Sequence, residues 1–235
     1  MIKLHNLQKV LNGNLVIDIP SLEVESQEIA ALVGPTGSGK MELLALLTGK
    51  TRPAAGTVRL ADIDPFQEKE RISQIAGVLF SEDAVYKHFS PLTNLEFQTK
   101  LYGLPRSRAS EVLAQVGLGD QAGAKLGQLS SSLVRRLAFG RAIIHNPQVL
   151  LLVEPFNRCD QLTVDFLSSL LKSFAEQGKA VLILANDQAN LNTLCDTIYI
   201  LHQGRISETH HPQEEKAERF PFKIPPNWRI KKLSY

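Results

Sequence analysis

Two patterns of hydrophobic residues divide the chain. Residues 2–19 alternate between apolar and polar positions and are broken by Asn12-Gly13-Asn14, which predicts two antiparallel strands joined by a hairpin and continuing through residues 22–24. Unbroken apolar runs follow at Ile29–Val33 and Val149–Val153, a pattern typical of parallel strands buried on both faces. The chain therefore combines an antiparallel segment with a parallel sheet.

Helical patterns lie between these strands. Apolar residues spaced three and four apart predict helices over 94–104, 107–116 and 162–176, and another that begins after Ser130 as N-cap. Further strands are predicted over 57–60, 72–80 and 180–184, with a closing hairpin over 198–206. Alternating strands and helices predict an α/β fold with a mostly parallel sheet. Residues 82–135 form a predicted helical insertion between strands of that sheet.

In an open parallel sheet, ligands bind beyond the carboxyl ends of the strands. The loops that follow Val33, Phe80, Val153 and Leu184 are therefore expected to converge on one site.

The composition sets limits on the class of protein. The 235 residues, 43% hydrophobic and 21% charged, suit one α/β domain with a small subdomain. The formal net charge of +2 does not indicate nucleic acid as a partner. Cys159 and Cys195 lack metal-ligand spacing, and no apolar run reaches about 18 residues. A cytoplasmic protein is expected, held at the inner membrane face only through partners.

The stretch Ala31-Leu32-Val33-Gly34-Pro35-Thr36-Gly37-Ser38-Gly39-Lys40-Met41 carries the clearest chemistry. An apolar strand enters a glycine-rich turn and a helix leaves it, which is the setting of a phosphate-binding loop. Glycines let backbone amides form an anion nest, and a lysine reaches the β- and γ-phosphates. The predicted nucleotide-binding residues are Gly34, Pro35, Thr36, Gly37, Ser38, Gly39 and Lys40.

One position of this motif is altered. The residue after the lysine is usually Ser or Thr, whose hydroxyl binds Mg²⁺, but here it is Met41. A thioether is a poor ligand for a hard cation that prefers oxygen.

Together with further segments, this loop resembles the nucleotide-binding domain of ATP-binding-cassette (ABC) proteins. The other supports are Leu-Ser-Ser-Ser-Leu at 129–133 followed by Arg-Arg-Leu-Ala, the run 142–155, and Asp160. The resemblance covers residues 2–206. It implies the ABC ATPase fold, a P-loop NTPase-like, mostly parallel sheet with an N-terminal antiparallel β subdomain and a helical insertion.

The resemblance implies partners as well. In this family two nucleotide-binding domains pair head to tail and sandwich ATP between one phosphate loop and the partner's signature segment, which drives membrane permease subunits. Ser130 of the signature-like segment would then face the partner's nucleotide. An ordinary helix N-cap is the alternative for Ser130, because Ser131 and Ser132 replace the glycines that allow close backbone approach.

Several catalytic positions depart from the family pattern. The strand that usually ends in a magnesium-binding aspartate ends in Val153, so that with Met41 both protein anchors for Mg²⁺ are missing. Ser81 and Asn186 stand where the family has a glutamine and a histidine. No aromatic residue for adenine lies within residues 9–13.

Glu154 remains at the position of the family's general base, with a structural role at the strand end as the alternative. Loss of one preorganised electrostatic contact costs about 10²–10³ in turnover. We therefore expect an inactive hydrolysis site, weak ATP binding and no protein-bound magnesium. For the phosphate loop, the alternative is that it persists because the fold needs its turn.

Two functional hypotheses follow. The first is a catalytically degenerate ATP-binding subunit of an ABC transporter, paired with another nucleotide-binding domain and with permease subunits. The second is a soluble pseudo-ATPase that serves as a dimerisation or sensing module, attached to or partnering a regulatory protein, for which DNA binding is one option. Residues 1–206 are expected to form the domain, and residues 207–235 a C-terminal extension or linker.

Overall fold

The computed structural model describes residues 1–212, and residues 213–235 lie outside the description. The predicted N-terminal hairpin is present. It belongs to a three-stranded antiparallel sheet in the order β2-β1-β4, made of β1 (Ile2–Leu11), β2 (Asn14–Val24) and β4 (Ala55–Leu60). Along β1, Ile2 and Leu4 are buried in alternation, and Leu7 continues the buried face after Asn6, whose φ of 46° shifts the pattern by one residue.

A second, larger sheet has the strand order β5-β6-β7-β3-β8-β9. Its strands are β3 (Ile29–Val33), β5 (Ala76–Leu79), β6 (Val149–Val153), β7 (Ala180–Ala185), β8 (Thr197–His202) and β9 (Arg205–His210). All neighbouring pairs are parallel except β8 and β9, which form an antiparallel hairpin. The carboxyl ends of β3, β5, β6 and β7 therefore share one edge of the sheet.

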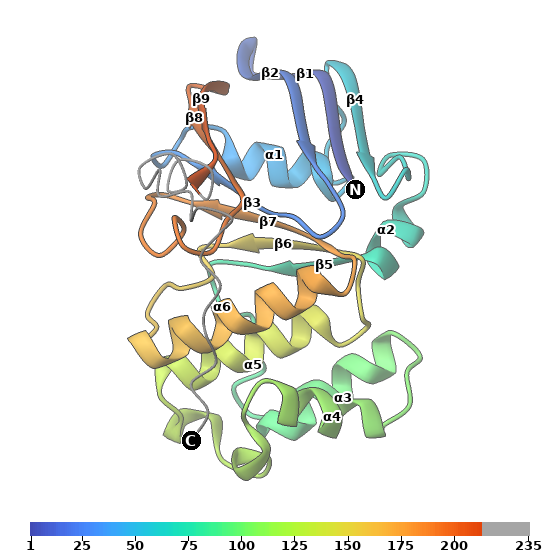
Figure 1. Cartoon of the computed structure of the whole chain (residues 1–235). Coiled ribbons are helices and arrows are strands. Elements are labelled where there is room, and N and C mark those ends of the chain that lie inside the picture. The colour runs from blue at the N-terminus through green and yellow to red at the C-terminus, as the bar shows by residue number, and fades with distance from the viewer. Residues whose placement is uncertain (213–235) are drawn as a thin grey trace, which may run out of the picture.

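The helices cover both faces of the large sheet. They are α1 (Lys40–Leu47), α2 (Lys69–Ile75), α3 (Pro91–Leu101), α4 (Ser107–Gln115), α5 (Ser131–Ile143) and α6 (Gln161–Glu176), with short 3₁₀ turns at Gly119–Gln121 and Leu126–Gln128. Figure 1 shows α1 between the two sheets, and α5 and α6 on the opposite face of the large sheet. Within residues 1–212, no helix is long and apolar enough to cross a membrane.

Alternate residues of the central strands point into two separate cores. On β3, Ile29, Ala31 and Val33 pack with the side of α5 and α6, whereas Ala30 and Leu32 pack with α1 and the antiparallel sheet. The run Val149–Val153 divides in the same way, and all five of its residues are buried. Burial on both faces explains why these strands appear in the sequence as continuous apolar runs.

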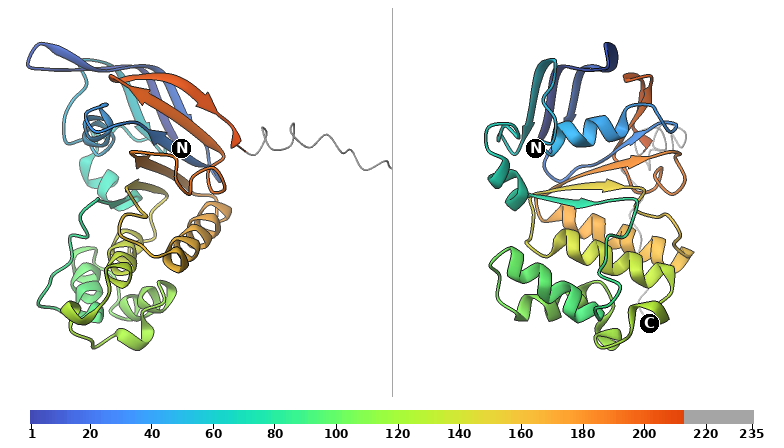
Figure 2. Two further views of the ribbon diagram at one scale, coloured as in Figure 1. Left: turned by 90° about the vertical axis from the view of Figure 1, so that its left-hand side faces the viewer. Right: turned by 180° about the vertical axis from the view of Figure 1, so that it is seen from behind.

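The helical insertion, α3 and α4 with the turns that follow them, forms the end of the molecule opposite the antiparallel sheet (Figures 1 and 2). Asn94 of α3 organises the loop that precedes it. Its fully buried amide accepts a hydrogen bond from the Tyr86 backbone N–H at 2.8 Å and donates to the carbonyls of Tyr86, Phe89 and Ser90. A buried side-chain amide with these partners fixes a loop that has no regular structure of its own.

Three of the predicted element bounds were wrong. The segment 72–80 is not one strand, because Ile72 and Ile75 belong to α2 and the strand begins only at Ala76. Helix α3 covers Pro91–Leu101 rather than 94–104, since Ser90 caps it by accepting a hydrogen bond from the Thr93 N–H. Strand β9 continues to His210, past the expected end at residue 206. Most of the predicted extension 207–235 lies outside the described residues.

Candidate functional site: the strand ends around the phosphate loop

The loop between β3 and α1 requires glycine at two positions. A Cβ atom on Gly34 would lie 2.2 Å from the Leu201 carbonyl oxygen. Gly39 has φ of +107°, and a Cβ there would lie 2.9 Å from the Val16 carbonyl oxygen. Both contacts are with backbone atoms, which cannot easily move aside. The geometry of the loop therefore depends on how tightly it packs against its own domain.

Lys40 lies at the start of α1, and only 7% of it is exposed. Its ammonium group donates to the carbonyl of Gly34, to that of Pro35 at 3.0 Å and to the Ser38 hydroxyl at 3.4 Å. Burial lowers the pKa of Lys40, while the negative charges of Glu154 and Glu42 act in the opposite direction. The ammonium group is thus held inside the loop, where a bound phosphate could take over its contacts.

Glu154 follows β6 and adopts a left-handed backbone conformation, with φ of 49°. Its backbone N–H donates to the Leu184 carbonyl at 2.9 Å, which ties this turn to the end of β7. Burial raises the pKa of Glu154, whereas the Asn186 N–H and the positive charges of Lys40 and Arg135 lower it. The strand ends converge as predicted. The charges of Lys40 and Glu154 influence each other, although no hydrogen bond or ion pair joins the two side chains among residues 1–212.

The two positions at which the family would hold magnesium do not fit this cation. Met41 is half exposed and lines a groove on the surface. Val153 is 4% exposed and packs in the core on the side of α1. Neither side chain offers the oxygen ligand that Mg²⁺ requires, so we assign no step to a metal ion held by these residues.

The adenine side of the site also lacks the family's usual residue type. Lys9 uses its ammonium group to bond the Arg52 carbonyl at 2.7 Å. Instead of an aromatic ring, the β1–β2 hairpin exposes three aliphatic side chains, Val10, Leu11 and Leu15.

The signature-like segment forms the first turn of α5. Ser130 is the N-cap, and its hydroxyl accepts a hydrogen bond from the Leu133 N–H at 3.3 Å. Ser131 donates to the Arg158 carbonyl at 2.9 Å, and the Ser132 hydroxyl accepts from the Asp160 N–H at 3.0 Å. Among residues 1–212, no hydrogen bond or ion pair joins Ser130 to the phosphate loop, so the two predicted nucleotide contacts stay separate within one chain.

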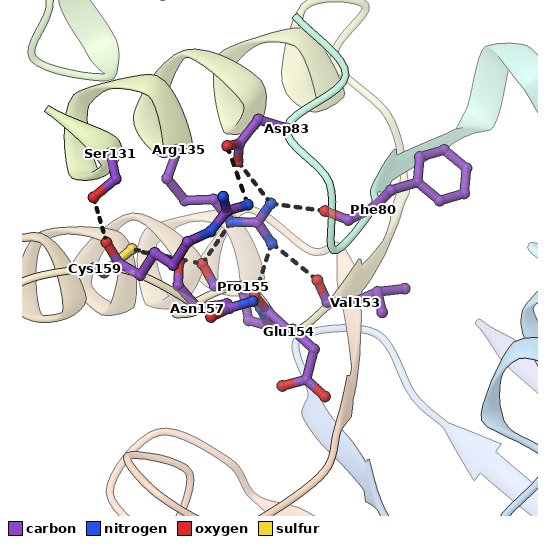
Figure 3. A network of polar contacts seen from close by, with 10 residues as sticks. Phe80, Asp83, Ser131, Arg135, Val153, Glu154, Pro155, Asn157 and Cys159 are labelled. Carbon is purple, nitrogen blue, oxygen red and sulfur yellow. Dashed lines mark hydrogen bonds and ion pairs between the residues drawn. The ribbon is translucent and has the colours of Figure 1, made fainter. Parts of the chain in front are cut away.

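Sequence reasoning missed the residue with the most contacts near the site, Arg135 of α5 (Figure 3). Its guanidinium group donates to the carbonyls of Phe80, Val153, Glu154 and Pro155 and to the carboxylate of Asp83. Burial lowers the pKa of Arg135, and the hydrogen bond with Asp83 opposes this. The available signal was its spacing, because Arg135 lies three and seven residues before Ala138 and Ala142, on the face of α5 that is buried.

A groove of about 510 Å³ adjoins these strand ends, between α1, α2, β5 and the helical insertion. Met41, Ile72 and Phe80 contribute apolar surface to it, and Lys50, Lys69, Arg141 and His145 contribute basic groups. The Nε atom of Arg141 and the Nδ1 atom of His145 are buried without a hydrogen-bond partner among the described residues. Because the Nε2 atom of His145 donates to the Ala76 carbonyl at 3.2 Å, its Nδ1 atom is an acceptor. In the described part of the chain, the groove thus combines an apolar wall with one unused donor, on Arg141, and one unused acceptor, on His145.

Comparison with known proteins decides which family this architecture represents. The sequence profile described as "ABC transporter" matches residues 17–157, well over half of the chain. The chain belongs to the ABC transporter family. The matched region includes the phosphate loop, the helical insertion, the signature-like segment and Glu154.

Individual members of the ABC transporter family are similar over most of the chain. The probable amino-acid import ATP-binding protein YxeO of Bacillus subtilis is 29% identical over 94% of this chain and 96% of its own length. The lantibiotic transport ATP-binding protein SrtF of Streptococcus pyogenes is 26% identical over 88% of this chain and 89% of its own length.

Solved structures confirm the ABC ATPase fold. The cbiO1 protein of Clostridium perfringens, described as part of an ABC transporter complex, superposes with a TM-score of 0.83 over 93% of this chain and 91% of its own, at 22% identity. A dimeric ATP-binding cassette bound to ADP and Pi superposes with a TM-score of 0.78 over 90% of this chain and 99% of its own, at 24% identity. At these identities the similarity supports the fold and no finer assignment.

Proposed function

We propose that this chain is the ATP-binding subunit of an ABC transport system and that it binds ATP without a protein-bound magnesium ion. One observation carries the proposal. The phosphate loop keeps its backbone geometry and its buried Lys40, while Met41 and Val153 offer no oxygen at the metal positions. Phosphoryl transfer depends on charge neutralisation by metal ions, so hydrolysis by this chain is slow or absent.

The proposed nucleotide contacts come from residues 34–40 of this chain, with Lys40 moving its hydrogen bonds from the loop carbonyls to phosphate oxygens. Ser130, the N-cap of α5, faces the nucleotide of a second nucleotide-binding domain. Its hydroxyl accepts from Leu133 and keeps its own proton available for a phosphate oxygen. One of the structural neighbours is described as dimeric, which supports this pairing.

A membrane permease is the proposed second partner, and the groove beside the helical insertion is its docking surface. Apolar Met41 and Phe80 are each about half exposed there and line the same groove, and grouped apolar side chains of this kind mark interaction surfaces. The positive charge of Arg141, whose Nε atom has no hydrogen-bond partner among the described residues, suits a permease segment that carries a carboxylate. Relatives named as import and transport ATP-binding proteins support this partner class over a soluble regulatory module.

The test is calorimetric titration of the purified chain with ATP, in the presence of Mg²⁺ and in its absence. We expect binding whose affinity changes less than about threefold with magnesium. Lys40→Ala should weaken it at least about 30-fold, because each charge-assisted hydrogen bond to phosphate contributes about 1.5–3 kcal/mol. Strong magnesium dependence would contradict the interpretation of the metal positions, and no binding at all would contradict the proposed function.

A further inference from the structure

Arg135 is a buried cation that neither nucleotide binding nor partner docking explains. Only 1% of it is exposed, and all five N–H bonds of its guanidinium group have acceptors. The Nε atom donates to Pro155 O at 3.0 Å, and one terminal nitrogen to Val153 O at 2.9 Å and Glu154 O at 2.7 Å. The other terminal nitrogen donates to Phe80 O at 2.7 Å and to the Asp83 carboxylate at 3.1 Å. A buried charge persists only when it is bonded to this extent.

These acceptors come from two loops that serve different surfaces. Glu154 and Pro155 follow β6, and the charge of Glu154 affects the pKa of Lys40 in the phosphate loop. Phe80 and Asp83 follow β5 and line the groove. In Figure 3 the guanidinium group lies between the two loops, with the Glu154 carboxylate pointing away from it. One planar group therefore joins the edge of the nucleotide site to the wall of the groove.

The first turn of α5 holds the same β6 loop at a second place. Ser131 bonds the Arg158 carbonyl and Ser132 bonds the Asp160 N–H. Glycines, which the family usually has at these two positions, could make neither bond because they have no hydroxyl. The β6 loop is thus fixed to α5 at both of its ends, and Arg135 extends that attachment to the β5 loop.

We propose that Arg135 is a positioning residue that couples the β6 loop to the β5 loop, so that a change at the nucleotide edge alters the groove. The roles of the nucleotide edge and of the groove come from the proposed function, on which this inference rests. The chemistry favours arginine specifically. Its rigid fork presents five donors in one plane, whereas lysine has three donors at a single point and cannot bridge the same carbonyls.

The main experiment separates ATP binding from its effect on the groove. Glu82 is exposed and lines the groove, so a fluorophore on Glu82→Cys reports on the β5 loop. Cys159 is changed to Ser in this protein, while Cys195 can stay because it is fully buried and burial raises its pKa to about 12. ATP should alter the fluorescence. With Arg135→Lys the calorimetric Kd should stay within about threefold, while the fluorescence change falls at least about fivefold.

Arg136→Lys is the matched control. Arg136 is the next residue of α5, bonds the Thr163 hydroxyl at 3.1 Å and stacks on Phe166, but touches neither loop. It should keep the full response. A response that survives Arg135→Lys, or that Arg136→Lys removes equally, overturns the proposal. If Arg135→Lys does not fold, Asp83→Ala replaces it, because this change removes one of the two bonds from Arg135 to the β5 loop and leaves the guanidinium group in place.

A measurement without nucleotide tests the coupling through Arg135 even if ATP does not bind. In the otherwise unchanged chain, the labelling rate of the Cys159 thiol reports on the β6 loop. Asp83→Ala should raise this rate at least about fivefold when Arg135 is present, and by less than about twofold in the Arg135→Lys background. Arg158 also contacts Asp83, at 3.6 Å, and this second link between the two loops is kept in the Arg135→Lys background, where its share of the effect is measured. Equal effects in the two backgrounds would overturn the coupling.

Discussion

The carboxyl ends of β3 and β6 lie on either side of β7 and differ in what they retain. After β3, the predicted phosphate loop has two positions, Gly34 and Gly39, at which a Cβ atom would meet backbone oxygens. At the end of β6, Val153 places a methyl-bearing side chain where the family would hold a metal. The packing of the fold requires glycine at these loop positions, whereas an apolar residue at the end of β6 packs into the core without loss of the fold.

Val153→Asp, at the end of β6, should have the largest effect on stability. Val153 is 4% exposed and packs in the core, so a carboxylate there is buried among apolar side chains. We expect a loss of about 3–4 kcal/mol in the free energy of unfolding at pH 7, measured by urea denaturation. Val153→Asn, which is polar and uncharged, should cost less. A Val153→Asp protein as stable as the parent would mean that the strand end already accommodates an acid.

Gly39→Ala tests the loop that follows β3. It places a methyl group at φ of +107° and 2.9 Å from the Val16 carbonyl oxygen, so about 2–3 kcal/mol of stability should be lost. Gly37→Ala is the control, because φ there is also positive but no atom lies within 4 Å. It should cost about 1 kcal/mol. Equal losses in urea denaturation would show that strain alone, and not packing against β2, fixes the loop.

The sequence predicted the parts of the site that are local in the chain. Ile29–Val33, Val149–Val153 and the glycine loop were located correctly, because burial on both faces and tight turns leave direct traces in residue type. Helix α2 was missed because Ile72 and Ile75 were interpreted as part of the following strand, although they are spaced about one helical turn apart.

The contacts of Arg135 could not be predicted. Four of its acceptors are backbone carbonyls, which carry no sequence signature, and they lie 18 to 55 positions away in the chain. The hydrogen bonds of Ser131 and Ser132 were equally hidden, since the sequence indicated only that glycines had been replaced. The domain boundary at residue 206 and the roles of the site residues stay predictions.

Restoring the oxygen ligands at the two metal positions should have a smaller effect, which appears in the affinity for ATP. In the double variant Met41→Ser with Val153→Asp, both oxygen ligands return, and Mg²⁺ should tighten ATP binding at least about tenfold, or about 1.4 kcal/mol. Calorimetry with and without Mg²⁺ measures this. Each single variant should gain less than about threefold. Magnesium dependence already present in the unchanged chain would mean that another oxygen ligand serves the site.

Glu154→Gln should have the smallest effect, and its pH dependence is the informative part. Burial raises the pKa of Glu154 above its unfolded value, so the folded state favours the protonated acid. Below the unfolded pKa both states are protonated and no cost arises. As the pH rises through the unfolded and then the folded pKa, ionisation destabilises the folded state, and the cost is complete above the folded pKa. Glutamine removes this cost at neutral pH.

Because Glu154 is only partly buried, solvent screening limits the gain to less than about 1 kcal/mol, or about 2–4 °C in Tm. Thermal unfolding of both proteins at about pH 4 and about pH 7.5 measures the difference, which should be present only at the higher pH. Asp165→Asn, at an exposed position of α6, is the control. A Glu154→Gln protein that is less stable at the higher pH would mean that the attraction of Lys40 and Arg135 for the carboxylate outweighs its burial. The acid would then belong with the retained phosphate loop rather than with the altered end of β6.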